Sequence, residues 1–264
     1  MTSQQAPVTR CDRVAPGHHL LELDCPAIAT TARPGQFVHV RVTGTFDPLL
    51  RRPISLLLCD KHRGHIQILV RTVGRGTDVL GHVAPGNVLD LMGPLGNGFP
   101  LPEAGQTPLL VAGGVGVAPL VFLADVLQNS PEGSYVRGLF GARNEDSLVC
   151  WEEFAGRCEE FQAVTEDGSV GEQGIVTEYL PAQLDRGDVG VVYTCGPRPM
   201  MAQVGRICEA AGVQCWASLE QFMGCGIGAC LGCAIATHTD PPNQRVCKDG
   251  PVFDARTVDW EKTL

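Results

Sequence analysis

Apolar and polar residues alternate in short runs over the first hundred residues, which is the period of half-buried β-strands. Turn-forming pairs such as Pro34-Gly35 and Pro85-Gly86 separate the runs. Strands at this spacing, with this punctuation, are typical of a small antiparallel barrel. The pattern predicts strands at residues 19–23, 37–42, 55–59, 66–71 and 88–92.

The pattern changes after residue 109 to short apolar runs that alternate with longer helical segments. This alternation predicts a parallel sheet with crossover helices, the doubly wound α/β type. We expect strands at 109–112, 135–142, 161–167, 189–195 and 214–220, and helices at 119–127 and 199–211. The glycine-rich stretch 93–100 has the composition of a domain boundary. The predicted organisation is a barrel domain over residues 1–103, an α/β domain over 104–217 and a small C-terminal loop subdomain over 218–264.

Composition limits the classes of partner and compartment. The 264 residues carry a net charge of −9, which argues against nucleic acid or an anionic membrane as a partner. Residues 1–20 contain no apolar segment of the kind found in signal peptides, so we expect a cytoplasmic protein with reduced thiols. Residues 108–124 lack charge, but the glycines and Pro119 within them predict a buried strand, a turn and a helix rather than a membrane span.

The C-terminal cysteines form the most informative motif. Cys225, Cys230 and Cys233 follow a C-x4-C-x2-C spacing, and Cys247 follows after thirteen intervening residues. This is the plant-type spacing that binds a [2Fe–2S] cluster, with two thiolates to each iron. The glycines between the cysteines allow tight turns and bring N–H groups close to the sulfurs. A structural zinc site is the alternative, although such sites usually have two separated cysteine pairs.

Most of the remaining ionisable side chains suggest no metal or catalytic site. The other eight cysteines are expected to be mainly small core residues. The seven histidines fall in turns and strands without metal or triad spacing, and we treat them as surface or core residues. These cysteines are Cys11, Cys25, Cys59, Cys150, Cys158, Cys195, Cys208 and Cys215, and the histidines are His18, His19, His39, His62, His65, His82 and His238.

Two segments of the barrel domain are candidates for phosphate binding. In the run Arg51-Arg52-Pro53-Ile54-Ser55, a guanidinium suits a pyrophosphate because it donates two charge-assisted bonds. In residues 69–77, a strand leads into Gly-Arg-Gly-Thr and a short helix, where backbone N–H groups can hold phosphate. Each motif alone also fits a solvated strand edge or an ordinary turn.

Two segments of the α/β domain are candidates for nucleotide binding. Gly113-Gly114-Val115-Gly116 follows the first parallel strand, where nucleotide phosphates bind in doubly wound sheets. Cys195-Gly196-Pro197 ends a later strand and is expected to face the same crevice. A turn without a ligand remains the alternative for the glycine segment.

Taken together, these motifs resemble the ferredoxin–NADP reductase superfamily. The cluster segment, with RRPIS and GPLGNGF, is similar to the family of electron-transfer subunits of dihydroorotate dehydrogenase B, the NAD-linked bacterial type. The resemblance implies one FAD and one [2Fe–2S] cluster per subunit, with NAD(H) as substrate. It assigns FAD to Arg52, Pro53, Ile54, Ser55, Leu69, Val70, Arg71, Gly76 and Thr77, NAD to Gly113, Gly114, Gly116, Cys195, Gly196 and Glu220, and the cluster to Cys225, Cys230, Cys233 and Cys247.

The resemblance also implies a function. A flavin can exchange electrons in pairs with NAD(H) and singly with an iron–sulfur cluster, so the three groups form a relay. No stretch of the sequence proposes a general base for oxidising dihydroorotate, so we expect an electron relay without catalytic residues of its own. It would serve an FMN-containing dihydroorotate dehydrogenase subunit in pyrimidine biosynthesis, as a heterotetramer with two of each subunit. The alternatives are a diaphorase-type subunit of a hydrogenase or of an NADH-dependent ferredoxin:NADP oxidoreductase, and a non-redox module that binds zinc and nucleotide.

Overall fold

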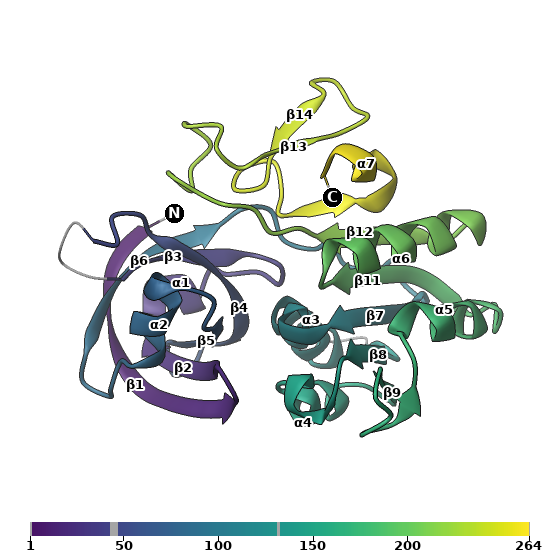
Figure 1. Ribbon diagram of the computed structural model, residues 1–264, viewed down its shortest axis with the longest axis horizontal. Coiled ribbons are helices and arrows are strands. Elements are labelled where there is room, and N and C mark those ends of the chain that lie inside the picture. Colours follow the sequence, from purple (N-terminus) through teal and green to yellow (C-terminus); the bar gives the residue numbers. More distant parts are fainter. Residues whose placement is uncertain (1, 43–46, 131–132, 264) are drawn as a thin grey trace.

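The N-terminal part of the chain closes into a six-stranded antiparallel barrel with strand order β1-β2-β5-β4-β3-β6. The computed structural model describes residues 2–42, 47–130 and 133–263, and Figure 1 shows the barrel in purple and blue. Its elements are β1 (Thr2–Ala15), β2 (His18–Asp24), α1 (Pro26–Ala29), β3 (Phe37–Arg41), β4 (Arg52–Asp60), β5 (His65–Arg71), α2 (Arg75–Gly81) and β6 (Val88–Leu95).

The strand pattern predicts this barrel except for β1. Most side chains of β1 are polar and exposed or only partly buried, because this strand pairs along its length with β2 and β6 while contributing few residues to the interior. It therefore lacks the apolar character from which the other five strands are predicted. The barrel interior is filled by aliphatic side chains, among them Val38, Val40, Ile66 and Ile68, which are fully buried.

The second part of the chain forms a seven-stranded sheet with the order β10-β9-β8-β7-β11-β12-β15. All the pairs are parallel except the one between β12 and β15. The elements are β7 (Thr107–Gly113), α3 (Val117–Gln128), β8 (Arg137–Ala142), α4 (Trp151–Ala155), β9 (Glu160–Thr165), β10 (Glu172–Gln173), α5 (Val176–Leu184), β11 (Val189–Cys195), α6 (Arg198–Ala210) and β12 (Gln214–Ser218).

Alternate residues of the central strands serve the two faces of this sheet. Leu109 and Val111 pack with the helices α5 and α6, whereas Leu110 and Ala112 pack with α3 and α4. The uncharged segment 108–124 thus becomes the buried strand β7, a single 3₁₀ turn and the buried helix α3. No helix in the described part of the chain has the length and apolar character needed to cross a bilayer.

The C-terminal segment packs on both of the larger units, and Figure 1 shows it in yellow across them. It contains the hairpin β13 (Ala234–Ala236) and β14 (Asn243–Arg245), the strand β15 (Val252–Asp254) and α7 (Trp260–Thr263). By pairing with β12, β15 extends the sheet of the preceding unit. One hydrophobic core joins Phe37 of the barrel, Val192 of the sheet and Cys247 of the cluster segment.

The eight cysteines outside the cluster motif are free, and five of them are buried. Cys25, Cys150, Cys195, Cys208 and Cys215 are buried, and Cys11, Cys59 and Cys158 are partly buried. The expectation of small core residues therefore holds for most of them.

We predict that Tyr193→Phe lowers the free energy of unfolding by about 1 kcal/mol, the typical net contribution of one hydrogen bond. The Tyr193 hydroxyl donates to the Pro100 carbonyl at 2.8 Å, and its buried ring meets Phe99 edge to face. This contact fastens the end of the barrel unit to β11. Denaturant unfolding of the two proteins measures the difference, and equal midpoints would contradict the assignment.

Candidate functional site

The two barrel motifs meet at one place. Arg52 opens β4, and its guanidinium lies over Gly76 in the first turn of α2. A Cβ on Gly76 would lie 2.5 Å from Arg52 Nε, so only glycine lets the guanidinium approach the helix this closely. The Arg52 side chain also donates to the Leu50 carbonyl at 2.7 Å, which fixes its direction. The fold thus places a cation beside the first-turn amides of α2.

Thr77 has a structural task within the same turn. Its hydroxyl accepts from the Val73 and Gly74 amides at 2.9 and 3.2 Å and donates to the Gly74 carbonyl at 3.0 Å. These bonds close the turn before α2 and occupy the hydroxyl. If Thr77 contacts a phosphate, its backbone amide is the available group.

The other predicted flavin residues lie on β4 and β5 around this point. Pro53, Ile54 and Ser55 are partly exposed along β4. Leu69 packs into the core shared with α3, and Val70 points into the barrel. Arg71 ends β5 with its side chain exposed, so it is the residue of this segment whose side chain is most open to a ligand.

The glycine motif and the Cys-Gly-Pro motif meet at the switch point of the sheet. β7 and β11 are neighbours, and the chain continues from them in opposite directions along the sheet. A Cβ on Gly116 would lie 2.5 Å from the Cys195 carbonyl, and one on Gly196 would lie 2.9 Å from Gly113 Cα. Gly114, which lies between Gly113 and Gly116 in the chain, has a positive φ and is partly exposed. Ligands of doubly wound sheets bind at this crevice.

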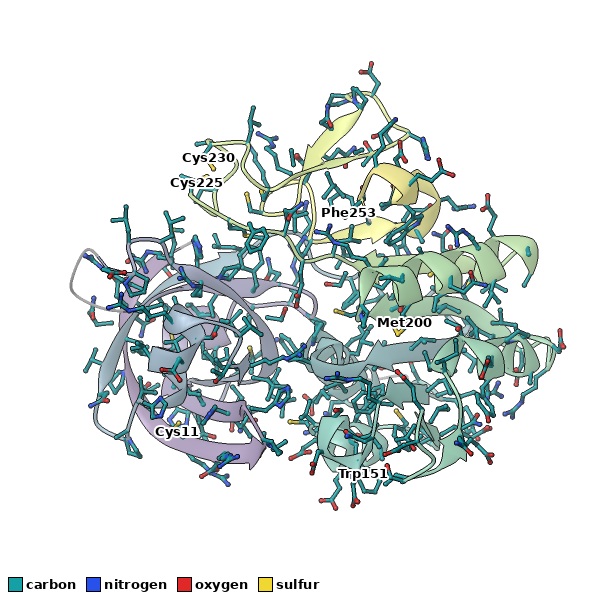
Figure 2. All side chains as sticks on the ribbon, in the orientation of Figure 1. Cys11, Trp151, Met200, Cys225, Cys230 and Phe253 are labelled. Carbon is teal, nitrogen blue, oxygen red and sulfur yellow. The ribbon has the colours of Figure 1, made fainter. Side chains whose placement is uncertain are left out.

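Met200, labelled in Figure 2, packs on the same two turns. Its sulfur would lie 2.5 Å from a Cβ on Gly113 and its methyl group 2.7 Å from one on Gly196. The Cys195 thiol is fully buried, and burial raises its pKa, so it remains protonated and acts as an apolar group. Sequence reasoning did not single out Met200, because a methionine in a helix carries no distinctive signal.

Glu220 follows β12 at the same carboxyl edge of the sheet. Removal from water raises the pKa of its carboxyl, and the guanidinium groups of Arg198 and Arg71 partly oppose the rise. The residue as a whole keeps exposed surface, although its carboxyl lies in crowded surroundings. Arg198 also donates to the Glu220 carbonyl at 2.9 Å. The barrel strand β5 therefore reaches the sheet edge through Arg71, where flavin and nucleotide motifs come together.

The four predicted cluster cysteines gather in the C-terminal segment as two thiol pairs. Cys225 and Cys230 contact each other, as do Cys233 and Cys247, and none forms a disulfide. Among the described residues, no group of three or more His, Cys, Asp or Glu side chains is arranged to hold a metal ion. A mononuclear zinc site needs four ligands around one point, whereas a [2Fe–2S] cluster needs two cysteines at each iron. The paired arrangement fits the two-iron cluster.

Backbone amides point at these sulfurs. The Ile227, Ala229 and Cys230 amides donate to Cys225 Sγ at 3.5, 3.3 and 3.4 Å. Desolvation opposes ionisation, but these amides, with the Cys230 thiol, lower the pKa of Cys225 to about 6. The thiolate that binds iron is therefore the favoured form near neutral pH.

Two of the three glycines in the motif donate in the way the sequence predicts. The Gly228 amide donates to Cys247 Sγ at 3.1 Å, and the Gly232 amide donates to Cys230 Sγ at 3.5 Å. Gly226 has another role, because a Cβ there would lie 2.5 Å from Nδ1 of the buried His39.

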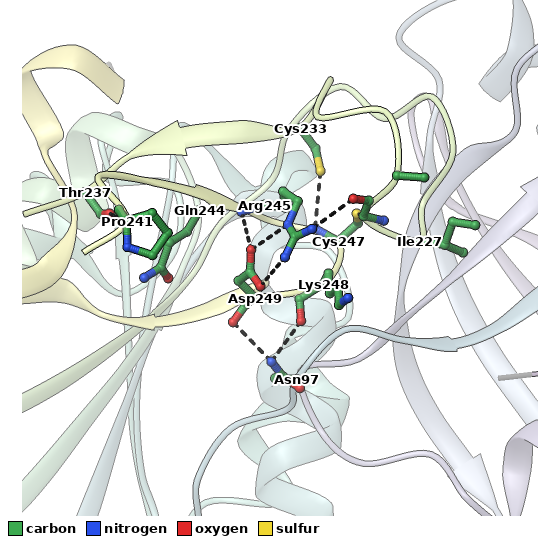
Figure 3. Close-up of polar contacts among 12 residues, drawn as sticks. Asn97, Ile227, Cys233, Thr237, Pro241, Gln244, Arg245, Cys247, Lys248 and Asp249 are labelled. Carbon is green, nitrogen blue, oxygen red and sulfur yellow. Dashed lines mark hydrogen bonds and ion pairs between the residues drawn. The ribbon is translucent and has the colours of Figure 1, made fainter. Parts of the chain in front are cut away.

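The arm that carries Cys247 is tied to the barrel unit, as Figure 3 shows. Asn97 Nδ2 donates to the Lys248 and Asp249 carbonyls at 3.0 and 3.1 Å. Arg245 pairs with Asp249 at 2.8 Å and donates to the Gly228 carbonyl at 3.0 Å. The glycine-rich stretch 93–100, which sequence reasoning took as a domain boundary and as part of the family resemblance, thus also anchors the segment that carries Cys247. The asparagine inside the glycine-rich stretch was the available signal.

The two thiol pairs differ in exposure. Cys233 and Cys247 are buried, at 2% and 3% of their possible surface, whereas Cys225 is partly exposed and Cys230 exposed. Figure 2 shows the latter two at the tip of the C-terminal segment. One side of a bound cluster therefore faces the protein and the other faces the surface.

Comparison with known proteins agrees with this geometry. Models of an oxidoreductase FAD-binding domain and an oxidoreductase NAD-binding domain match residues 6–99 and 110–206. The iron–sulfur cluster binding domain of dihydroorotate dehydrogenase B matches residues 220–259. The dihydroorotate dehydrogenase B (NAD(+)) electron transfer subunit of Desulforamulus reducens is 44% identical over 250 residues, which are 94% of this chain and 95% of that protein.

The chain belongs to the family of dihydroorotate dehydrogenase B electron-transfer subunits.

A second family member, from Geobacillus sp. (strain WCH70), is 40% identical over 98% of this chain and 99% of its own length. Among solved structures, the NADH-dependent reduced ferredoxin–NADP oxidoreductase superposes with a TM-score of 0.87 at 28% identity, over 98% of this chain and 91% of that one. A cytochrome P450 reductase from Amycolatopsis gives 0.67 at 26% identity, over 80% of this chain and 66% of that one. This chain is thus an NAD-linked oxidoreductase subunit with FAD-binding, NAD-binding and iron–sulfur domains.

We predict that Gly76→Ala weakens FAD binding at least tenfold, because the new methyl group displaces the Arg52 guanidinium. Gly74→Ala is the matched control: its backbone is extended, and a Cβ there meets nothing within 4 Å. Fluorescence titration of FAD onto the flavin-free proteins measures both affinities. Equal loss in the two variants would show that the turn, and not Arg52, is what matters.

We predict that Cys230→Ser abolishes the [2Fe–2S] EPR signal of the reduced protein while FAD remains bound. Cys11→Ser, at a partly buried cysteine of β1, should keep the full signal. An unchanged signal in Cys230→Ser would exclude this cysteine as a ligand.

Proposed function

We propose that this chain carries electrons between NAD(H) and a separate FMN-containing subunit that interconverts dihydroorotate and orotate in pyrimidine biosynthesis. The observation that carries the proposal is the orientation of the cluster site, with one thiol pair buried against the protein and the other at the surface. Such a site takes electrons from inside the chain and passes them to another protein. The relatives are named as the electron transfer subunit of dihydroorotate dehydrogenase B (NAD(+)), which supports the proposal.

Different residues of the chain are proposed to hold FAD and NAD. Arg52 and the first-turn amides of α2 hold the FAD pyrophosphate, with Pro53, Ile54, Ser55 and residues 69–71 along the flavin. The turns after β7 and β11 bind the NAD phosphates, and Glu220 lies at the edge where the nicotinamide meets the flavin. When bound, the flavin exchanges electron pairs with NAD(H) and single electrons with the cluster.

The surface around the exposed thiol pair suits a protein partner. Phe222, Leu231 and Ile227 expose 91%, 63% and 45% of their possible surface beside the cluster ligands. Exposed apolar side chains gathered at one place mark interaction sites. The partner proposed for this surface is the FMN-containing subunit, in a cytoplasmic heterotetramer of two copies of each subunit with no role for a membrane or nucleic acid.

A diaphorase-type subunit that serves a ferredoxin–NADP oxidoreductase is the second candidate. The TM-score of 0.87 with such a protein supports it, because the two share the whole architecture. Identity of 44% to a dihydroorotate dehydrogenase B subunit, against 28% here, favours the first proposal.

We predict that the isolated chain, loaded with FAD and cluster, reduces artificial acceptors with NADH but does not oxidise dihydroorotate. Addition of the FMN-containing subunit should produce dihydroorotate-dependent reduction of NAD. Phe222→Ser should weaken the association of the two subunits by about 1–3 kcal/mol, the range for truncating a central interface side chain.

Ile175→Ser, which changes an apolar residue 49% exposed before α5, is the control and should leave the association unchanged. Dihydroorotate oxidation by the chain alone would overturn the proposal. Failure with the FMN-containing subunit, together with reduction of ferredoxin or NADP in the presence of another partner, would establish the second candidate.

A further inference from the structure

His39 lies on the face of β3 that meets the cluster segment. Side chains alternate along a strand, and Val38 and Val40 of β3 point into the barrel interior. Phe37 and His39 therefore point outward. Phe37 packs in the same core as Cys233 and Cys247, which shows that the C-terminal segment covers this face.

The His39 ring is enclosed by protein without a hydrogen-bond partner. Its exposed fraction is 0%, and neither ring nitrogen has a partner among the described residues. A Cβ on Gly226 would lie 2.5 Å from Nδ1, so this ring edge presses against the backbone next to the ligand Cys225. Gly226 has a φ of +70°, which a residue with a side chain rarely adopts. The loop is thus shaped to bring its backbone onto the imidazole.

The polar groups around His39 leave both ring nitrogens without a hydrogen bond. Arg51 donates to the His39 carbonyl at 3.3 Å and pairs with Asp90 at 2.8 Å, so both the carbonyl and that carboxylate are engaged. Burial, with the positive charges of Arg51 and Arg52, lowers the pKa of His39 to about 4, and the nearby backbone of Arg51 only partly opposes this fall without meeting the geometry of a hydrogen bond. The ring is neutral at physiological pH and has one N–H to donate in either tautomer. An unpaired buried donor costs about 1–3 kcal/mol, so such groups normally have a partner.

We propose that the His39 ring N–H donates a hydrogen bond to a sulfur of the [2Fe–2S] cluster held by this chain, and that this bond raises the reduction potential of the cluster. Sulfur is the acceptor that the cluster segment brings to the ring, since Gly226 adjoins Cys225. Hydrogen bonds to cluster sulfurs stabilise the more negative, reduced state. The inference depends on the cluster site and not on the identity of the partner subunit.

The bond would tune the relay at the step between the flavin and the cluster. His39 pairs with Pro53 of β4 across the strand ladder, so it lies between the flavin motif and the cluster loop. A higher cluster potential favours transfer from the flavin to the cluster and opposes the return. Backbone amides already donate to Cys225, Cys230 and Cys247, and His39 adds a side-chain donor from the barrel.

The test is an EPR-monitored redox titration of the holoprotein and of three variants. His39→Leu removes the donor and should lower the one-electron reduction constant of the cluster about tenfold, which corresponds to a shift of about 59 mV to lower potential. His39→Gln keeps an N–H donor and should shift less. Ile68→Val alters packing inside the barrel, away from the face that meets the cluster segment, and should leave the cluster potential unchanged.

A spectroscopic measurement covers the case in which His39→Leu fails to retain its cluster. With ¹⁵N-labelled histidine, the reduced wild-type protein should show a ¹⁵N hyperfine coupling to the cluster spin. Absence of that coupling would overturn the proposal. An unchanged cluster potential in a cluster-loaded His39→Leu protein, or a shift of the flavin potential alone, would overturn it as well. Dihydroorotate activity, which tests the proposed function, does not enter these readouts.

Discussion

The structure depends on holding four thiolates of one irregular segment at fixed positions between two larger units. A loop with this many glycines has high conformational entropy in the unfolded chain, so it needs outside support to present ligands in a fixed arrangement. Three contacts supply it: β15 pairs with β12, Asn97 holds the arm of Cys247, and Phe37 joins the core that contains Cys233 and Cys247. The cluster segment is thereby fixed to both the barrel and the sheet.

The same packing places the proposed nucleotide, flavin and cluster sites next to one another in space. The carboxyl ends of β7 and β11 carry the turns proposed to bind nucleotide, and Arg71 at the end of β5 lies near Glu220 beside them. The outer side of β3 touches the cluster loop. Electron transfer slows steeply with distance, so a relay needs these sites in contact rather than on mobile units. Packing of α3 against β4 fixes the first junction, and the close approach of His39 to Gly226 fixes the second.

Positively charged side chains lie at the proposed cofactor site although the chain as a whole is negatively charged. The whole chain carries a charge of −9, yet Arg52 lies against the first turn of α2, where an anionic cofactor is expected to bind, and Arg71 lies near Glu220. Arg52 is directed by its bond to the Leu50 carbonyl, and its approach to α2 is permitted by Gly76. At the cluster, neutral dipoles take the place of cations: amide groups lower the pKa of Cys225 to about 6.

The sequence by itself determined the fold class, the cysteine spacing that predicts an iron–sulfur cluster, and the order of the functional segments. Those features are encoded in local patterns, namely strand and helix periodicity, cysteine spacing and glycine turns, which do not depend on what packs against them. The tertiary structure decided the rest. The polar strand β1 is identified as part of the barrel only by its pairing with β2 and β6. Asn97 and Lys248 are 151 positions apart in the chain, and His39 and Gly226 are still further apart, so no local pattern could bring either pair together. Burial and partners are properties of packing, and packing alone distinguished His39 from the other histidines.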